Sequence, residues 1–233
     1  APKIAAVVFA FRILVTGMGT IHSDWAPMLA ILAVASLVVG NLAAIMQTNI
    51  KRMLAYSTVS HMGFILLAFM AGAVGFTAGL YYAITYALMA AVSFGVLMVL
   101  STKDIECENI KDLAGLNQRH AWFAFLMLLS MFSMAGIPPL MGFYAKFGVI
   151  MALLKQGHVW LSVFAVIMSL IGAFYYLRVV KVIYFDAPDH DQPVGSNYAA
   201  KFVLTVNAFL LLLWGIMPQT VIDWCAKALI NTL

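Results

Sequence analysis

The chain has 233 residues, of which 64% are hydrophobic and only 9% are charged, and its mean hydropathy is +1.00. Soluble domains carry about 25% charged residues, so this composition excludes a soluble globular protein and indicates an integral membrane protein. The formal net charge of +4 is therefore interpreted through the positions of the basic residues in the loops beside the lipid bilayer, and no nucleic-acid partner is expected. The two cysteines, Cys107 and Cys225, have no CxxC or zinc-type spacing, so we expect no metal and no cofactor in this chain.

Seven segments are apolar enough and long enough to cross a bilayer, which takes about 20 residues per helix. They cover residues 3–20, 26–46, 57–73, 76–100, 121–154, 159–185 and 198–217. The predicted fold class is an all-α integral membrane protein of about seven transmembrane helices, forming a single membrane domain over residues 1–233. The tail, 221–233, is too short to span, and its apolar spacing favours a helix lying in the interface. Because the chain enters a hydrophobic segment directly from Ala1, we expect it to be part of a longer polypeptide.

The fifth segment, 121–154, is interrupted by Gly136-Ile137-Pro138-Pro139. As one straight helix it would be roughly 51 Å long, whereas the hydrocarbon core is about 30 Å thick. The two prolines remove two backbone donors and force the preceding residue out of the α region. We therefore predict two half-helices joined by a short bend, a feature that marks ion or substrate sites in transporters.

Lys146 follows this bend in an otherwise apolar stretch and is the leading candidate for chemistry. At 1.5 Å per residue it lies about 13 Å below the surface that begins near Lys155. A charge at that depth costs at least a few kcal/mol, and an amine removed from water loses proton affinity, so such a lysine can take up and release protons. The alternative is a lysine that extends along a tilted helix to the interface.

Lys3 and Arg12 share the first segment. Lys3 either reaches the inner membrane surface at a helix end or, if a longer helix precedes it, is buried. At about 100° per residue Arg12 falls on the opposite helix face, so the two should not line one pathway together. We expect Arg12 to be a structural residue.

Ser57 and His61 stand four residues apart on one face of the third segment. Histidine titrates near neutral pH and can relay protons. The alternative is a serine that caps the helix and a histidine about one turn inside the interface.

A polar stripe runs along the fourth segment, which is otherwise apolar. It consists of Tyr82, Tyr86, Thr85 and Ser93. These hydroxyls either hold a chain of water molecules between titratable groups or hydrogen-bond neighbouring helices. No carboxylate lies inside any of the seven segments, so a buried lysine would take its counter-ion from sequence outside this chain or from another subunit.

The basic residues predict the orientation. The side on which the first segment starts holds eight Lys and Arg residues: Lys51, Arg52, Lys103, Lys111, Arg119, Arg178, Lys181 and Lys201. The opposite side holds two, Lys155 and Lys227. Because cytoplasmic loops are enriched in Lys and Arg, we expect the basic loops in the cytoplasm and the C-terminus outside.

Two stretches carry a specific signature. The first, 47–63, reads QTNIKRMLAYSTVSHMG, and the second, 134–147, reads MAGIPPLMGFYAKF; FYYLR follows at 174–178. These stretches resemble the antiporter-like membrane subunits of respiratory complex I, and the resemblance extends over nearly all of the chain. It implies the C-terminal half of such a subunit, helices 8 to 14, without the glutamate of helix 5 and the lysine of helix 7.

The resemblance also implies a function. Lys3 matches the family's lysine of helix 8 and Lys146 that of the broken helix 12, both of which carry protons, while Ser57 and His61 lie near the inner approach. It implies a proton-translocating subunit in the bacterial inner membrane, coupled to NADH oxidation and quinone reduction. Quinone, FMN and iron–sulfur clusters are then expected in other subunits. The expected partners are the lipid bilayer and neighbouring membrane subunits, both antiporter-like and small.

Two other functions remain open. A membrane subunit of a multisubunit cation/proton antiporter shares both motifs, but we expect histidine there in place of Tyr82 or Tyr86. A purely structural scaffold subunit would direct Lys146 to an interface or to lipid headgroups.

Overall fold

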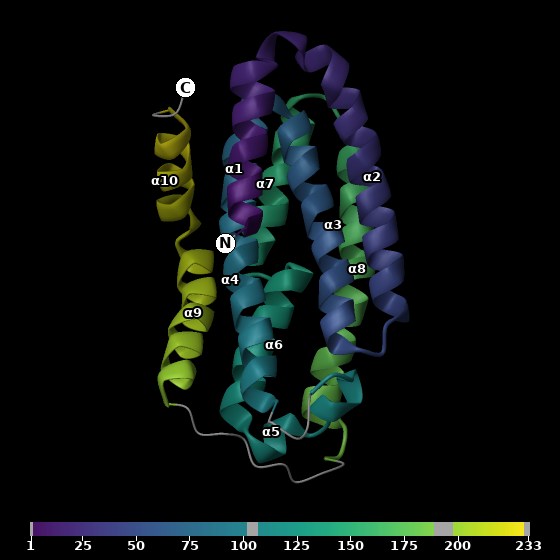
Figure 1. Cartoon of the computed structure of the whole chain (residues 1–233), viewed down its shortest axis with the longest axis vertical. Coiled ribbons are helices and arrows are strands. Elements are labelled where there is room, and N and C mark those ends of the chain that lie inside the picture. Colours follow the sequence, from purple (N-terminus) through teal and green to yellow (C-terminus); the bar gives the residue numbers. More distant parts are fainter. Residues whose placement is uncertain (1, 102–106, 189–197, 231–233) are drawn as a thin grey trace.

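The computed structural model describes residues 2–101, 107–188 and 198–230, which form an elongated helical bundle (Figure 1). Five stretches in these ranges are long and apolar enough to cross a membrane: Gly19–Met46, Ile50–Met70, Val74–Leu100, Val159–Phe185 and Tyr198–Ile216. Ile4–Val15 and Ala121–Ala135 are shorter apolar helices. The prediction of an all-α membrane fold with one interrupted helix is confirmed.

The first segment is not one straight helix over 3–20. Helix α1 (Pro2–Phe11) passes into a π-helical turn, η1 (Arg12–Gly17), and a 3₁₀ turn, η2 (Gly19–Ile21), before α2 (His22–Met46) begins. Two glycines in this turn region and the β-branched residues before them disfavour a regular α-helix. Helix α1 begins near the middle of the bundle's long axis and runs to the end at which α2 starts (Figure 1).

Helix α3 (Ile50–Met70) begins earlier than the predicted segment 57–73, because its first turns are polar and hydropathy does not detect them. Asn49 is the N-cap, and its side-chain oxygen accepts a hydrogen bond of 3.0 Å from the Arg52 backbone N–H. Helix α4 (Gly72–Leu100) follows after a tight turn at Gly72, whose φ is 66°. Ser57 therefore lies about two turns inside α3 and does not cap it.

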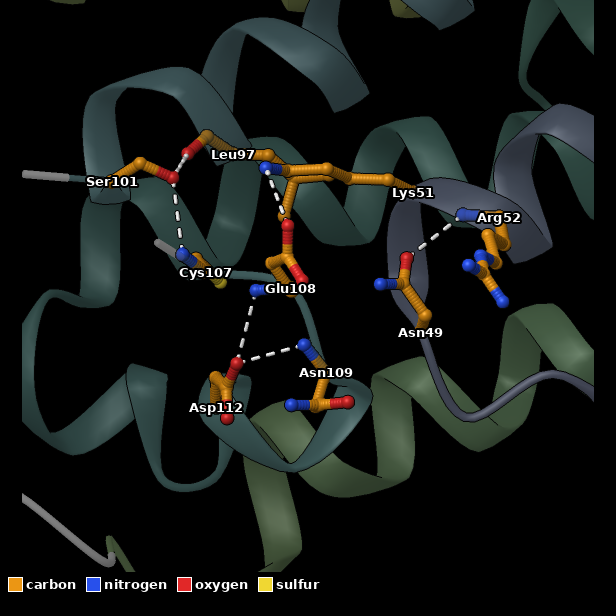
Figure 2. A network of polar contacts seen from close by, with 9 residues as sticks. All are labelled: Asn49, Lys51, Arg52, Leu97, Ser101, Cys107, Glu108, Asn109 and Asp112. Carbon is orange, nitrogen blue, oxygen red and sulfur yellow. Dashed lines mark hydrogen bonds and ion pairs between the residues drawn. The ribbon is translucent and has the colours of Figure 1, made fainter. Parts of the chain in front are cut away.

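The basic end of α3 is tied to the connection between α4 and α6 (Figure 2). This connection contains η3 (Ile110–Leu113) and the short α5 (Leu116–Arg119). The Ile50 N–H donates to the Glu108 carbonyl at 2.7 Å, the Ile110 N–H donates to the Thr48 carbonyl at 2.9 Å, and Lys51 pairs with Glu108 at 3.7 Å. These bonds satisfy backbone groups that a loop at a helix start would otherwise expose.

The interrupted segment forms two half-helices, α6 (Ala121–Ala135) and α7 (Met141–Lys155). Gly136 ends α6 with a φ of 89°, a left-handed conformation that favours glycine. The Gly142 N–H near the start of α7 donates to the Ser133 hydroxyl of α6 at 3.1 Å. Backbone polar groups at membrane depth need such partners, so α6 supplies part of what the bend leaves unpaired.

Three helices complete the bundle: α8 (Val159–Phe185), α9 (Tyr198–Ile216) and α10 (Pro218–Ile230). Arg178 of α8 donates to the carbonyls of Ile45 and Gln47 at 3.0 and 2.6 Å, which caps the end of α2. Gly215 of α9 packs against the backbone of residues 139–141, where a Cβ atom would collide, so α9 covers the bend. Helix α10 runs along the bundle's long axis (Figure 1), not across it as an interfacial helix would.

Gly40 makes close packing of α2 against α3 possible, because a Cβ atom there would lie 2.5 Å from the Ser60 backbone nitrogen. We expect Gly40→Ala to separate these helices at a cost of about 1–3 kcal/mol and to lower the thermal unfolding temperature of the detergent-solubilised protein. Gly17→Ala is the control, since its Cβ meets nothing within 4 Å. Equal unfolding temperatures for the two variants would contradict this packing.

Candidate functional site

Lys146 of α7 is buried, with 7% of its surface exposed. Its amine donates hydrogen bonds of 2.9 Å to the Ala135 carbonyl and 2.9 Å to the Ser169 hydroxyl of α8. The amine also lies 5.7 Å from the centre of the Phe64 ring. The side chain therefore points into the bundle and does not extend to the membrane surface.

The bend supplies the main partner of this amine. Ala135 is the last residue of α6, and the final carbonyls of a helix have no intrahelical donor. They also carry the partial negative charge of the helix dipole, which stabilises a cation by about 0.3–2 kcal/mol. A Cβ on Gly136 would lie 3.1 Å from the Lys146 Cδ atom, so glycine both forms the bend and leaves room for the lysine.

His61 lies at the centre of a buried group of hydroxyls and is 3% exposed. Its Nδ1 atom is 2.8 Å from the Tyr82 hydroxyl, and its Nε2 atom is 2.9 Å from the Tyr176 hydroxyl of α8. A neutral imidazole donates from one nitrogen and accepts at the other, so one tyrosine accepts while the other donates. His61 is therefore buried inside the bundle, about three turns after the start of α3.

Tyr86 and Ser57 belong to the same group. The Tyr86 hydroxyl is 2.5 Å from the Thr58 hydroxyl, and the Tyr86 ring lies 4.9 Å from the His61 ring. Ser57 donates to the Leu54 carbonyl at 2.8 Å and is hydrogen-bonded to Tyr176. Four residues predicted from the sequence, Ser57, His61, Tyr82 and Tyr86, are thus brought together by α3 and α4.

A small cavity lies between Lys146 and His61, and both line it together with residues of α2 and α8. Its volume is about 10 Å³, about the space that one water molecule needs. The Tyr175 hydroxyl donates to the Asn41 side-chain oxygen at 3.0 Å, and the Asn41 amide donates to the Met168 carbonyl at 3.0 Å. The cavity therefore has polar walls and joins the lysine to the histidine group.

Sequence reasoning missed four of the polar residues that line this cavity: Asn41, Ser169, Tyr175 and Tyr176. Asn41 is the only amide in the apolar segment 26–46 before its polar end, which was an available signal. The two tyrosines belong to the FYYLR stretch, but the sequence pattern assigns them no role. They reach the site because α8 packs against α2 and α6, which the pattern of one segment does not reveal.

Arg12 and part of the polar stripe of α4 lie apart from this site. The side chain of Lys3 falls outside the described residues, although its backbone belongs to α1. Arg12 is exposed at the start of η1. The polar stripe of α4 divides, because Ser93 bonds to Ser130 of α6 at 2.6 Å and Thr85 bonds to the Tyr81 carbonyl of its own helix.

The site contains a cation, an imidazole and hydroxyls. Among the described residues Lys146 has no carboxylate partner, and no group of three or more His, Cys, Asp or Glu there can hold a metal ion. Cys107 lies in the loop beyond α4, where burial and the nearby Asp112 carboxylate raise the pKa of its thiol to about 11, so the thiol stays protonated at neutral pH. Proton transfer is the chemistry that these side chains support.

The chain is similar to known proteins in its family sequence pattern, in its sequence as a whole and in its fold. A family described as "NADH:quinone oxidoreductase/Mrp antiporter, TM" matches residues 1–172. NADH-quinone oxidoreductase subunit N of Neisseria gonorrhoeae is 82% identical over all of this chain and 49% of its own length, and that of Nitrosomonas europaea is 51% identical with the same coverage. The chain spans about half the length of the curated relatives that it matches.

Solved structures agree with the fold. A chain of respiratory complex I from Thermus thermophilus is 31% identical, with a TM-score of 0.76 over 84% of this chain and 45% of its own. A chain of the Mrp complex from Dietzia has a TM-score of 0.79 over 88% of this chain and 47% of its own, but at 21% identity this likeness concerns the fold alone.

Within the family the sequence most resembles subunit N. The resemblance implies that Tyr82 and Tyr86 stand where the sister subunits usually carry histidines, and that Lys146 stands where one sister subunit carries a glutamate. The curated relatives named above agree with this resemblance. The match over residues 1–172 and the shared fold show that the chain belongs to the family of NADH:quinone oxidoreductase and Mrp antiporter membrane subunits.

Proposed function

We propose that this chain is the proton-translocating C-terminal part of a membrane subunit of NADH-quinone oxidoreductase, in which Lys146 and Lys3 carry protons. The observation that carries the proposal is the buried Lys146 amine, held at the helix bend with no carboxylate partner among the described residues. In this proposal NADH oxidation and quinone reduction take place in other subunits, which hold FMN, iron–sulfur clusters and quinone. In this proposal the chain contributes proton movement to that translocase, and the redox chemistry belongs to the other subunits.

The proposed mechanism is electrostatic. A unit charge that moves to within about 6 Å of Lys146 changes its protonation free energy by roughly 3 kcal/mol at an effective dielectric constant near 20. That energy corresponds to roughly a hundredfold change in the ratio of protonated to neutral lysine. Charge movement in a neighbouring subunit therefore loads and unloads Lys146 without a redox group in this chain.

His61 provides the proton relay toward Lys146. Both of its ring nitrogens contact tyrosine hydroxyls, so a proton that arrives at one nitrogen is released from the other. Tyr82, Tyr86 and Ser57 hold the imidazole and continue the hydroxyl chain. By its resemblance to the family's lysine of helix 8, Lys3 precedes this relay and delivers the proton from the other half of the subunit.

The basic residues support an orientation in the bacterial inner membrane. Lys51 and Arg52 at the start of α3 and Lys111 and Arg119 near η3 and α5 lie at one end of the bundle, and Lys155 lies at the other. We place the basic end in the cytoplasm and the C-terminus outside. The partners in this arrangement are the lipid bilayer and neighbouring complex I subunits, both antiporter-like and small.

A multisubunit cation/proton antiporter is the second candidate, since the family description includes Mrp antiporters. Tyr82 and Tyr86, where such subunits are expected to carry histidine, favour the first proposal. A purely structural scaffold is disfavoured by the inward direction of the Lys146 amine, since that role requires no buried cation.

Lys146→Ala in the full-length subunit of the assembled complex is expected to abolish the proton movement of this subunit, because no other described amine occupies the bend. Proton uptake by inside-out membrane vesicles, measured per NADH oxidised, should fall while assembly stays intact. Lys155→Ala, at the exposed end of the same helix, should leave this ratio unchanged. Normal pumping by an assembled Lys146→Ala complex would rule the role out.

His61→Phe keeps an aromatic ring in the core but removes both nitrogens that contact tyrosines. We expect the proton-to-NADH ratio to approach that of Lys146→Ala, because the relay between the two residues is broken. His120→Phe, in the loop at the basic end, is the matched control. If both histidine variants pump equally well, His61 is a structural residue.

Gly136→Ala is expected to displace the lysine, because alanine at a φ of 89° costs about 1–3 kcal/mol and its Cβ approaches the Lys146 side chain. We expect the proton-to-NADH ratio to fall while the yield of intact complex stays normal. Gly148→Ala, whose Cβ meets Ala78 at an ordinary 3.6 Å, should retain normal coupling. An unaltered ratio for Gly136→Ala would show that the bend does not position Lys146.

A further inference from the structure

Asn41 of α2 joins the group around His61 to the backbone of α8, and it is 1% exposed. Its side-chain amide donates to the Met168 carbonyl at 3.0 Å. A backbone carbonyl can only accept hydrogen bonds, so this contact fixes which end of the Asn41 side chain carries the NH₂ group. The other end is the oxygen, and it accepts a hydrogen bond of 3.0 Å from the Tyr175 hydroxyl. The Tyr175 proton is therefore committed to Asn41.

Ser57 of α3 also commits its proton to a carbonyl. Its hydroxyl donates to the Leu54 carbonyl at 2.8 Å and is hydrogen-bonded to Tyr176 as well. Tyr175 and Tyr176 are hydrogen-bonded to each other, and their ring centres lie 4.4 Å apart. Because a hydroxyl carries one proton, Ser57 and Tyr175 present only lone pairs to the Tyr176 oxygen. The Tyr176 proton is therefore directed toward these two oxygens.

The remaining partner of Tyr176 is the Nε2 atom of His61, at 2.9 Å. If Tyr176 donated to this nitrogen, its oxygen would face two further oxygens with no proton between them, and unpaired polar groups in a buried site are costly. The ring nitrogen supplies the proton of this bond instead. The Nδ1 atom of the neutral ring is then an acceptor, and the Tyr82 hydroxyl donates to it across 2.8 Å.

We infer that Asn41 and Ser57 are positioning residues that hold neutral His61 in the tautomer with its proton on Nε2. The inference deepens the proposed function, on which it rests, because it concerns the proton that His61 carries. The lone pair on Nδ1 takes up a proton from the Tyr82 side, and the imidazolium releases a proton from Nε2 on the Tyr176 side. One proton enters and one leaves, and no other species is consumed or formed.

This order of hydrogen bonds directs the released proton toward the small cavity that Lys146 lines. Tyr176 and Asn41 line the same cavity. The Asn41 oxygen and the Leu54 carbonyl end the chain of hydroxyls, because each can accept a hydrogen bond but carries no proton to pass on. A proton that leaves Nε2 through Tyr176 therefore has the cavity, with room for about one water molecule, as its outlet.

The tautomer can be measured by solid-state NMR on membranes that contain the assembled complex, with the full-length subunit and isotope-labelled histidine. The signals of His61 are those that His61→Phe removes. At about pH 8.5, above the ordinary titration range of histidine, the ring is neutral, and the chemical shifts of its two nitrogens show which one carries the proton. We expect the proton on Nε2. A proton mainly on Nδ1, or comparable amounts of the two tautomers, in the native complex would overturn the inference.

Two double variants test the positioning role. Asn41→Leu with Ser57→Ala removes both anchors, so the two tautomers of His61 should occur in comparable amounts and the proton-to-NADH ratio should fall. Tyr175→Phe with Ser57→Ala should act alike, because it breaks the link to Asn41 but keeps the ring, and it serves if the first variant does not assemble. Ser130→Ala removes a buried hydroxyl of α6 outside this chain of bonds and should change neither the tautomer nor the ratio. A single, unchanged tautomer in both double variants would show that these residues do not set it.

Failure of this inference can be told apart from failure of the proposed relay. If His61→Phe pumps normally while the native ring carries its proton on Nε2, the relay is wrong and the assignment of the tautomer is supported. If His61→Phe stops pumping while the native ring carries its proton on Nδ1, the relay is supported and the inference is overturned.

Discussion

The bond between the Lys146 amine and the Ala135 carbonyl is the interaction on which the rest of the site depends. A lysine inside a bilayer needs a partner, and a helix that ends inside a bilayer leaves carbonyls without donors. The two costs offset each other here, because the Lys146 amine of α7 donates a hydrogen bond to the Ala135 carbonyl at the end of α6. Gly136 makes this possible, and α9 covers the bend through Gly215. The cation is therefore held without a neutralising carboxylate in the described structure.

This arrangement makes the charge of Lys146 sensitive to its surroundings. A carboxylate in contact would favour the charged form, whereas carbonyl and hydroxyl partners leave the energies of the two protonation states closer together. The small cavity toward His61 lies beside the lysine. The relay through His61 is the proposal that follows from this geometry.

The sequence was sufficient for local features and insufficient for long-range ones. The bend was predictable because two adjacent prolines act on their own backbone, and Lys146 because charge is rare in an apolar segment. The start of α3 was missed because Lys51 and Arg52 belong to its first turn and lower its hydropathy. Angular position alone placed Ser93 with the tyrosines of α4, but the helices that meet each turn of α4 are different.

Contacts between residues of distant segments could not be predicted from the sequence pattern. His61 was singled out for its titration range, but its contact with Tyr176 joins positions 115 residues apart. Asn41 reaches Tyr175 across a similar separation. Such pairs depend on how α2, α3 and α8 pack, which is set by close approaches at glycines such as Gly40 and not by the period of any one helix.

The most direct test of the central claim is a density map of the assembled complex that resolves side chains and ordered water around residues 130–170. The account predicts separate half-helices on either side of Pro138, with the Lys146 amine bonded to the Ala135 carbonyl and the Ser169 hydroxyl and with water on the His61 side. A continuous helix through Pro138, with the amine among lipid phosphates, would contradict it.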